Sequence, residues 1–474
     1  MGELRRLSRR GFLRAAGIAG GAAVLAACVP ATPTPVPAAA TATPAEAVPS
    51  PAALAPVVLT YWDWHQPRVN VYEPYFARYC EEIVPGSRIE VTIIPWAEYW
   101  TKAMAAIPAG QGPDIYHFHN SQHSAFIGAG LVERWPMDMP DLFDLADFRE
   151  NWAGFKEGHF TYIPDGNIYY IPYGSMAPVL YVNEEYWQEA GLTDADAPKT
   201  WDEVPAVAKK LSKYAEDGEL IQAGFGFNGY ANLIWSDMLY QQGQWWYDKS
   251  GKKVQFDTPA SRNALRILRD FIDLHKVNSS SFLSFTEGFG TRKIAMTWSW
   301  TWFSGFIRTN YPDLKFISFP QPTFTGTDLP AYGRQNYEVS IVVNPKPPKD
   351  QKLACWQLLK WLYSNDELLV DLNLAHNIVP AKRTLREHPR IQADREIKIL
   401  AEHVDYTVFP GEFPHLLWEA FGRYIDQDFI QGNATLDETI SMLVTEGNRI
   451  LAERDYWIIE RNYPYADRFT PHGE

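Results

Sequence analysis

Hydrophobic residues follow two alternating periodicities in the first third of the folded region. Short apolar or β-branched runs at 57–61, 89–94 and 112–116 are typical of strands. Between them, apolar positions recur at helical spacing within 71–83 and 96–107. Strand, helix, strand, helix, strand is the order of a doubly wound α/β domain, whose ligands collect at the carboxyl ends of the strands.

The middle and end of the chain continue this alternation. A strand is predicted at 179–183, followed by a helix at 184–190. Segments 200–203 (TWDE) and 435–438 (TLDE) each place Glu three residues after Thr, the capping-box pattern that opens a helix. About 418 residues follow position 56, more than one hydrophobic core usually supports, so two domains are expected.

The N-terminus has a different pattern. Arg9 and Arg10 precede Phe-Leu, a Gly/Ala-rich apolar stretch covers 15–27, and Leu-Ala-Ala-Cys ends at Cys28. The paired arginines resemble a twin-arginine export signal, and the last four residues resemble the lipobox of bacterial lipoproteins. The stretch is short for a spanning helix, which needs about 20 apolar residues. We therefore expect a signal peptide at 1–27 and a lipid anchor on Cys28.

The next segment is low in complexity. Residues 28–56 are nearly all Ala, Thr, Pro and Val, with too little bulky apolar surface to fold, so a Pro/Thr/Ala-rich tether is expected. No later segment has the length and apolar character of a membrane span. The anchor alone would hold the protein at the extracytoplasmic face of the cell membrane.

The net charge of the chain narrows the range of partners. The whole chain has a formal net charge of −14, which becomes −18 without residues 1–27. This balance excludes nucleic acid and anionic lipid as favoured partners, because both require a positive surface.

Cys80 and Cys355 both lie among apolar residues of predicted helices, where either two unpaired thiols or one disulfide is compatible with export.

Aromatic residues are abundant, with 18 Trp, 25 Tyr and 25 Phe. Several gather with polar residues in predicted loops at 61–65, 245–247 and 298–303. Trp298 is expected to belong to the core, because its neighbours look buried. Sugars present apolar C–H faces and hydroxyl edges, and loops that combine aromatic rings with polar side chains suit both.

Five segments together resemble one family in their order and spacing: 112–116 (GPDIY), 171–192, 198–211, 293–303 (KIAMTWSWTWF) and 316–322 (FISFPQP). The chain is similar to extracellular solute-binding proteins of the sugar-binding class, the receptors of ABC importers, from about 57 to about 451. The resemblance implies an α/β, two-lobe periplasmic-binding-protein-like fold (type II), each lobe a doubly wound sheet flanked by helices, joined by a hinge. It assigns 57–172 plus 322–372 to an N-lobe and 176–318 plus 378–465 to a C-lobe.

The resemblance also implies which residues contact ligand. They lie in the loop after the first strand, after the strand that contains Pro-Asp-Ile at 113–115, near the first hinge crossing, after the "AM" motif and in a late C-lobe helix. In that order these are Asp63, Trp64, His65, Phe118, His119, Asn120, Ser175, Trp300, Trp302 and Trp418. Loop position adds Tyr230, Asn232, Arg334, Asn336 and Tyr337.

Two further patterns carry less weight. Residues 224–229 fit GxGxxG as a string but lack a convincing strand–helix unit with a following acidic residue, so no dinucleotide site is predicted. His117, His119 and His123 lack an adjacent carboxylate that would complete a metal site, so no metal and no cofactor are expected.

The sequence therefore predicts a monomeric, non-catalytic receptor that captures a carbohydrate and delivers it to the permease subunits of an ABC transporter. The abundance of aromatic residues favours an oligosaccharide as that carbohydrate. A secreted glycoside hydrolase is the alternative, and it would require two carboxyl groups about 5–10 Å apart. Only Asp63 is a carboxylate expected near the cleft. A receptor for a non-sugar polyol or a glycerophosphodiester is the other alternative.

Overall fold

The computed structural model describes residues 55–152, 166–324, 330–334, 336–338, 341–408, 410, 414–453, 460 and 466–469. The predicted signal peptide, Cys28 and all but the last two residues of the tether lie outside the described residues. Among the residues described, no helix has the length and apolar character needed to span a bilayer.

The first sheet has the strand order β12-β3-β1-β2. Three strands are parallel, and β12 runs antiparallel to β3. Their bounds are β1 Val58–Asp63, β2 Arg88–Ile93, β3 Ile115–His117 and β12 Ile341–Val343. Alternate residues of β1 are buried, as expected for a strand with one covered face. The predicted strands of the first third are confirmed.

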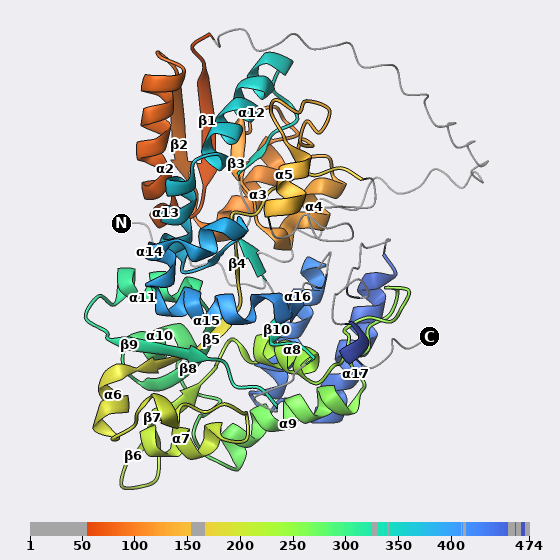
Figure 1. Ribbon diagram of the computed structural model, residues 1–474. Helices are drawn as coiled ribbons and strands as arrows, with labels where there is room; N and C mark the ends of the chain where they lie inside the picture. The colour runs from red at the N-terminus through yellow and green to blue at the C-terminus, as the bar shows by residue number, and fades with distance from the viewer. Residues whose placement is uncertain are drawn as a thin grey trace, which may run out of the picture. The chain divides into compact units, whose positions relative to one another are not determined.

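Helices pack around this sheet and, with it, form what we call the N-lobe (Figure 1). They are α2 Gln66–Arg78, α3 Trp96–Ala106, α4 His123–Gly128, α5 Leu145–Asn151, α12 Lys349–Tyr363 and α13 Asp366–His376. The predicted helix at 71–83 is α2 followed by a π-helical turn at Tyr79–Ile83. Tyr61 packs edge-on against Tyr72 and Phe76 of α2, which joins strand and helix in one core.

The second sheet has the order β6-β7-β8-β5-β9 and, with its helices, forms what we call the C-lobe. Its strands are β5 Pro178–Asn183, β6 Lys213–Tyr214, β7 Leu220–Gly226, β8 Ile294–Trp300 and β9 Phe316–Pro320. Strands β5 and β8 are buried throughout. The pair β7·β8 is parallel, whereas β5 runs antiparallel to both of its neighbours, so this sheet is mixed.

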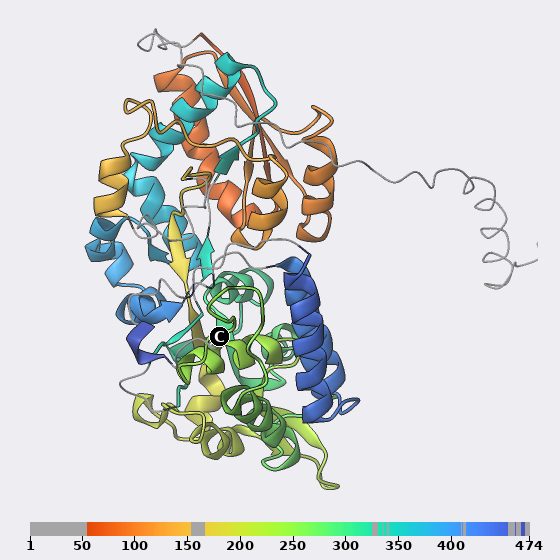
Figure 2. The same cartoon turned by 90° about the vertical axis from the view of Figure 1, so that its right-hand side faces the viewer.

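The C-lobe helices cover both faces of this sheet and extend to one side of it (Figure 2). They are α6 Glu184–Glu189, α7 Val204–Leu211, α8 Ala231–Gln241, α9 Pro259–Asp273, α10 Phe285–Gly290, α11 Trp302–Asn310, α15 Arg395–His403, α16 His415–Phe421 and α17 Leu436–Leu451. A π-helical segment, Gly422–Phe429, continues α16. Helix α8 is buried on all sides, so it is the central helix of this lobe.

A small third sheet, β11-β4-β13, links segments that are distant in sequence. Its strands are β4 Gly174–Met176, β11 Asn336–Glu338 and β13 Val379–Pro380, all antiparallel. Strand β4 leads directly into β5 of the C-lobe. At Gly174 any Cβ atom would lie 2.4 Å from Asn373 Oδ1, so only glycine fits this close approach. Strands β10 Gly333–Arg334 and β14 Thr407–Val408 form a separate parallel pair.

The two predicted capping boxes have different outcomes. At α17 the box is confirmed: the Thr435 hydroxyl accepts from Glu438 N, and the Glu438 carboxylate accepts from Thr435 N. At 200–203 only one half forms, because Glu203 accepts from Thr200 N and Lys199 N. Helix α7 begins later, at Val204, because residues 201–203 form a turn.

Both cysteines of the described region are free thiols, which settles the alternative that the sequence left open. Cys355 is buried in α12, and Cys80 is half-buried in the π-helical turn. Burial raises the pKa of both thiols, which keeps them protonated and unreactive at neutral pH.

Candidate functional site

The N-lobe contributes three loops that leave the same edge of its sheet. Asp63, at the end of β1, pairs in register with Ile93 of β2, and Trp62 pairs with Tyr116 of β3. Because these strands are parallel, the residues that follow each of them meet at one edge. This edge therefore collects Trp64 and His65, Trp96, and His119.

Asp63 is fully buried and holds the first of these loops. Its carboxylate accepts two hydrogen bonds from Arg68, 2.9 Å from Nε to Oδ2 and 2.5 Å from Nη2 to Oδ1. It also accepts from Trp64 N, His65 N and the Tyr61 hydroxyl. Burial disfavours the charged carboxylate, but Arg68 outweighs this effect, and the pKa of Asp63 lies well below its usual range.

Aromatic rings pack edge to face along the same edge. Trp64 lies 5.0 Å from Trp96, 4.9 Å from Tyr99 and 6.4 Å from His119 between ring centroids. The Arg68 guanidinium covers the Trp64 ring at 4.7 Å. Trp96 remains 45% exposed although it contacts three rings, so one of its sides stays open. The sequence did not single out Trp96, because its own neighbours are ordinary for a helix start.

Arg334 is the centre of the C-lobe part of the site. It is buried, and its guanidinium lies over the rings of Trp300, Trp418 and Trp246 at 4.4, 5.0 and 5.9 Å. Its backbone N–H donates to Asp237 Oδ1 at 3.0 Å. Burial lowers the pKa of Arg334 to about 10, with Asp237 opposing, so the side chain stays charged at neutral pH.

Arg334 lies near enough to His119 for its charge to affect that imidazole. After burial, the charges of Arg68 and Arg334 are the causes that lower the pKa of His119 to about 3. His119 belongs to the N-lobe edge and Arg334 to the C-lobe, so the two groups interact between lobes. The structure thus brings predicted site residues from both lobes into one region.

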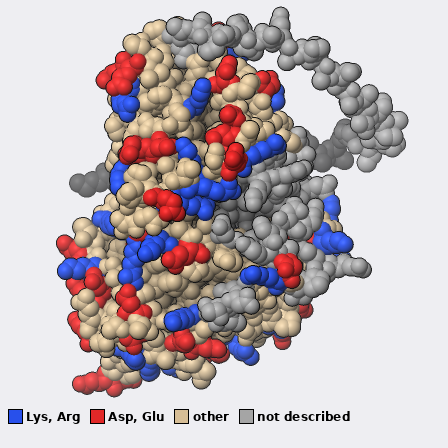
Figure 3. Space-filling model, in the orientation of Figure 1, with Lys and Arg blue, Asp and Glu red and all other residues tan. Residues whose placement is uncertain are grey.

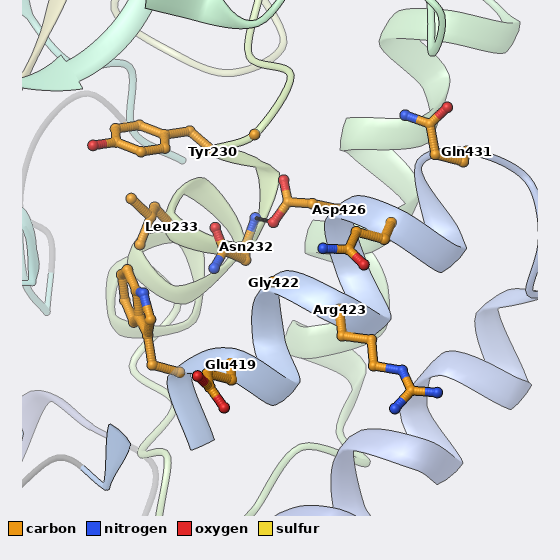
Figure 4. Close-up of a pocket in the computed structure, with 11 residues that line it drawn as sticks. Tyr230, Asn232, Leu233, Glu419, Gly422, Arg423, Asp426 and Gln431 are labelled. Carbon is orange, nitrogen blue, oxygen red and sulfur yellow. Dashed lines mark hydrogen bonds between the residues drawn. The ribbon is translucent and has the colours of Figure 1, made fainter. Parts of the chain in front are cut away.

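A pocket of about 830 Å³ opens beside Trp418 in the C-lobe (Figure 4). This volume is in the usual range for small-molecule sites. Its walls are the start of α8 on one side and α16 with its π-helical continuation on the other. The lining residues include Tyr230, Asn232, Trp418, Glu419, Arg423, Asp426 and Gln431. Three of these, Tyr230, Asn232 and Trp418, are residues that the sequence suggested.

Asp426 closes the amino end of α8 at the bottom of this pocket. Its carboxylate accepts from Ala231 N at 2.8 Å and from Asn232 N at 3.4 Å. Burial raises its pKa to about 7, and these two hydrogen bonds oppose the rise. The buried Asn232 Oδ1 has no hydrogen-bond partner among the described residues. Burial raises the pKa of Tyr230, and the nearby Trp302 side chain opposes the rise.

The GxGxxG string at 224–229 covers the end of strand β7 and most of the loop that leads into helix α8. Strand β7 and helix α8 do form a strand–helix unit around it, so the expectation that this unit is missing was wrong. Asp426 occupies the amino end of α8, where a dinucleotide phosphate would need to bind. No group of histidine, cysteine and acidic side chains suited to a metal occurs in the described part of the chain.

Other predicted site residues lie deeper or carry no described side chain. Phe118 is fully buried between Trp100, Phe126 and Tyr170, and Ser175 is buried in β4. Trp300 is 8% exposed beneath Arg334, and Trp302 is half-buried. Trp298 is in the core, as predicted, with its indole N–H bonded to Gln321. The side chains of Asn120, Asn336 and Tyr337 lie outside the described residues.

The fold defines a class: a two-lobed α/β binding protein. A family model described as bacterial extracellular solute-binding protein matches residues 76–399, more than half of the chain. The chain belongs to this family, whose members are receptors and not enzymes. The hydrolase alternative is thereby excluded.

Individual relatives are distant. A binding protein of Brucella abortus is 26% identical over 293 residues, which cover 60% of this chain and 66% of the relative, just under two thirds of its length. A maltotriose-binding protein of Pyrococcus abyssi is 20% identical over 366 residues, covering 77% of this chain and 76% of the relative. The solved GacH receptor of Streptomyces glaucescens, known unliganded and with acarbose, has a TM-score of 0.68 at 18% identity, covering 85% and 99% of the two chains. This last likeness shows the fold.

Proposed function

We propose that this protein captures a neutral oligosaccharide between its lobes and delivers it intact to an ABC transporter permease. The observation that carries the proposal is the arrangement around Arg334. Three tryptophan rings surround its guanidinium, and His119 of the N-lobe lies near enough to be affected by its charge. A pocket of about 830 Å³, lined by Tyr230, Asn232 and Trp418 among others, opens beside the same tryptophans. Apolar ring faces with adjacent hydrogen-bonding groups suit the faces and edges of sugars. Relatives named for maltotriose and arabinooligosaccharides support this ligand class.

The candidate residues divide into two roles in this proposal. The side chains offered to ligand are Trp64, His65, His119, Tyr230, Asn232, Trp302, Arg334 and Trp418, with Asn120, Asn336 and Tyr337 as further contacts. The second role is structural support of these side chains. Asp63 fixes the loop that carries Trp64 and His65. The other supporting residues are buried, and they are Phe118, Ser175 and Trp300.

The organisation of the chain extends the proposal. We infer a signal peptide at 1–27 exported by the twin-arginine route, a lipidated Cys28, and a tether to residue 56. The N-lobe would comprise 57–172 plus 322–372 and the C-lobe 176–318 plus 378–465, with a monomer as the working form. Within 322–372 the short strand Gly333–Arg334 is an exception, because Arg334 packs against helix α8 and the tryptophans of the C-lobe. On the face shown in Figure 3, acidic and basic side chains are interspersed over both lobes. This mixture fits docking to a protein better than binding to a polyanion.

Calorimetry and tryptophan fluorescence with a glycan series test the proposal. We expect saturable, one-to-one binding of at least one di- to hexasaccharide, with the sugar recovered intact by chromatography. Glycerol and sn-glycerol 3-phosphate are included as representatives of the polyol and phosphorylated alternatives. Binding of either of these in place of every saccharide would overturn the proposal, as would release of a shortened sugar.

A further inference from the structure

The tautomer of His376 follows from its neighbours at the end of α13. Its Nδ1 lies 3.0 Å from the carbonyl oxygen of Leu372, which can only accept a hydrogen bond. The Tyr173 hydroxyl lies 3.4 Å from the same nitrogen, but a hydroxyl can accept as well as donate, whereas the carbonyl leaves no choice. Nδ1 therefore carries the proton. In a neutral imidazole the other nitrogen then has a lone pair, so His376 Nε2 is an acceptor.

The position of the proton on His376 determines the tautomer of His65, which lies on the sheet edge proposed to bind ligand. His65 Nδ1 lies 3.0 Å from His376 Nε2, and since the latter accepts, the former must donate. His65 Nε2 is then left with a lone pair. That nitrogen has no hydrogen-bond partner among the described residues and is not among the buried unpaired atoms, so it reaches the solvent.

His119 has the opposite arrangement. The backbone N–H of Ser121 points at its Nδ1 over 3.2 Å, and a backbone N–H can only donate. Nδ1 therefore accepts, and the Ser121 hydroxyl lies 2.9 Å from the same nitrogen. The proton is on Nε2, which has no partner among the described residues and is likewise not among the buried unpaired atoms.

Both rings are neutral in this environment. Burial, followed by the charge of Arg68, lowers the pKa of His65 to about 4 and that of His119 to about 3. At neutral pH neither imidazole can therefore become a cation that would attract an anion.

We propose that His65 and His119 are held in opposite tautomers, so that one offers a fixed acceptor and the other a fixed donor to the ligand. The inference rests on the proposed function and narrows it. A sugar hydroxyl can both donate and accept, so it can satisfy both nitrogens. An ionised phosphate oxygen can only accept, and it would meet the lone pair of His65 Nε2 without a proton between them. The pair selects a neutral, hydroxyl-bearing ligand over a phosphorylated one.

Nitrogen-15 NMR of histidine-labelled protein measures this directly. At pH 7 we expect Nδ1-protonated signatures for His65 and His376 and an Nε2-protonated signature for His119. His403 is an internal reference, because its Nδ1 lies 2.7 Å from the Ile399 carbonyl oxygen and must donate to it, so this nitrogen should carry a proton as His376 Nδ1 does. Reversed tautomers at His65 or His119, or a charged ring at either position, would overturn the inference whatever the protein binds.

Variants separate the tautomer from the binding function. His376→Leu removes the acceptor, so the His65 signature should become a mixture while the His119 signature stays unchanged; an unchanged His65 signature in the folded variant would refute the relay. His65→Phe should weaken maltotriose binding by about tenfold, the usual effect of one lost hydrogen bond, and His403→Gln should leave it unchanged. If the wild type has the expected tautomers but binds no saccharide, the proposed function fails and the tautomer assignment survives. If the wild type binds sn-glycerol 3-phosphate more tightly than maltotriose, the selectivity is refuted.

Discussion

At the residue scale, the loop after β1 shows why a polar motif need not present its charge to a ligand. The described hydrogen bonds to the Asp63 carboxylate all come from the protein itself. The donors are Arg68, the Tyr61 hydroxyl and two backbone N–H groups. The buried ion pair fixes the backbone from which Trp64 and His65 project. Removing one partner of such a pair leaves an uncompensated buried charge, which is far more costly than losing an exposed pair.

Asp63→Ala should accordingly lower the free energy of unfolding by about 3–5 kcal/mol. The control is Glu446→Ala, because Arg449 donates two hydrogen bonds to the Glu446 carboxylate on the surface. Loss of this exposed pair should lower the free energy of unfolding by less than about 1 kcal/mol. Urea denaturation at pH 7 measures both. Since the folded pKa of Asp63 is lowered, its contribution is present above about pH 4 and is lost as the pH falls below that value. Equal losses in the two variants would contradict this account of the loop.

Trp302 is the aromatic contact most open to test. It is half-buried at the start of α11, near enough to Tyr230 on the pocket wall to affect the pKa of that phenol. Trp302→Ala should weaken oligosaccharide binding by more than about 1 kcal/mol, because an aromatic face against a sugar is lost. Trp361→Ala is the matched control, since this half-buried ring contacts Tyr79 and Arg78 at the far end of α2. Unchanged calorimetric affinity in a folded Trp302 variant would remove it from the site.

At the element scale, α8 is a helix buried on every side whose amino end is closed by a side chain from a distant segment. Asp426 accepts from the first two N–H groups of the helix. Such groups otherwise lack partners, and a buried helix end cannot turn to water. The carboxyl group is held in a buried position where its pKa rises to about 7.

Asp426→Asn should change how stability depends on pH. A raised folded pKa means that the folded protein binds this proton more tightly than the unfolded chain, so its contribution falls as the pH rises from about 4 to about 7. The amide can still accept from Ala231 N but does not titrate. Relative to the variant, the wild type should therefore lose stability between pH 5 and pH 8 in urea denaturation. A constant difference across this range would show that Asp426 does not titrate there.

The two Thr-x-x-Glu segments provide a matched pair of helix starts. Thr435→Ala should destabilise the protein by about 1 kcal/mol, because it removes the hydroxyl that caps α17. Thr200→Ala should cost less, because its hydroxyl makes no capping bond and Glu203 bonds to backbone N–H groups that remain. Chemical denaturation of both variants compares them. A larger loss at Thr200 than at Thr435 would contradict the structural difference.

At the scale of the whole molecule, the two lobes are joined through the small third sheet. Strands β4, β11 and β13 come from three separate parts of the chain, so a rotation of one lobe must be absorbed by residues flanking these short strands. His376 ends the helix immediately before β13 and bonds to His65 on the sheet edge proposed to bind ligand. A single hydrogen bond therefore connects His65 with the end of α13, the helix that leads into the third sheet.

We expect ligand to bring the lobes closer, because contacts from both are satisfied only when they face one another across it. Small-angle X-ray scattering should show a smaller radius of gyration with a saturating saccharide than without it. Trp302→Ala at the same saccharide concentration is the control for closure caused by binding. An unchanged radius in the presence of a sugar shown to bind by calorimetry would refute closure.

The sequence by itself determined the order of elements and the family, because both depend on local information. Alternating apolar periods located the strands and helices of the first third, and short motifs in register identified the class. It also determined that Trp298 is core, since its own neighbours are apolar.

Only the tertiary structure decided what the candidate polar residues do. The five donors to the Asp63 carboxylate all lie within five residues of it, but only the folded backbone shows that they turn towards it. His376 lies 311 residues from the histidine whose tautomer it sets. Asp426 at the amino end of α8 and the Thr200 turn were equally invisible, since each depends on which segment packs beside it. Hydrogen bonds act over about 3 Å in space, whereas sequence patterns record only neighbours along the chain.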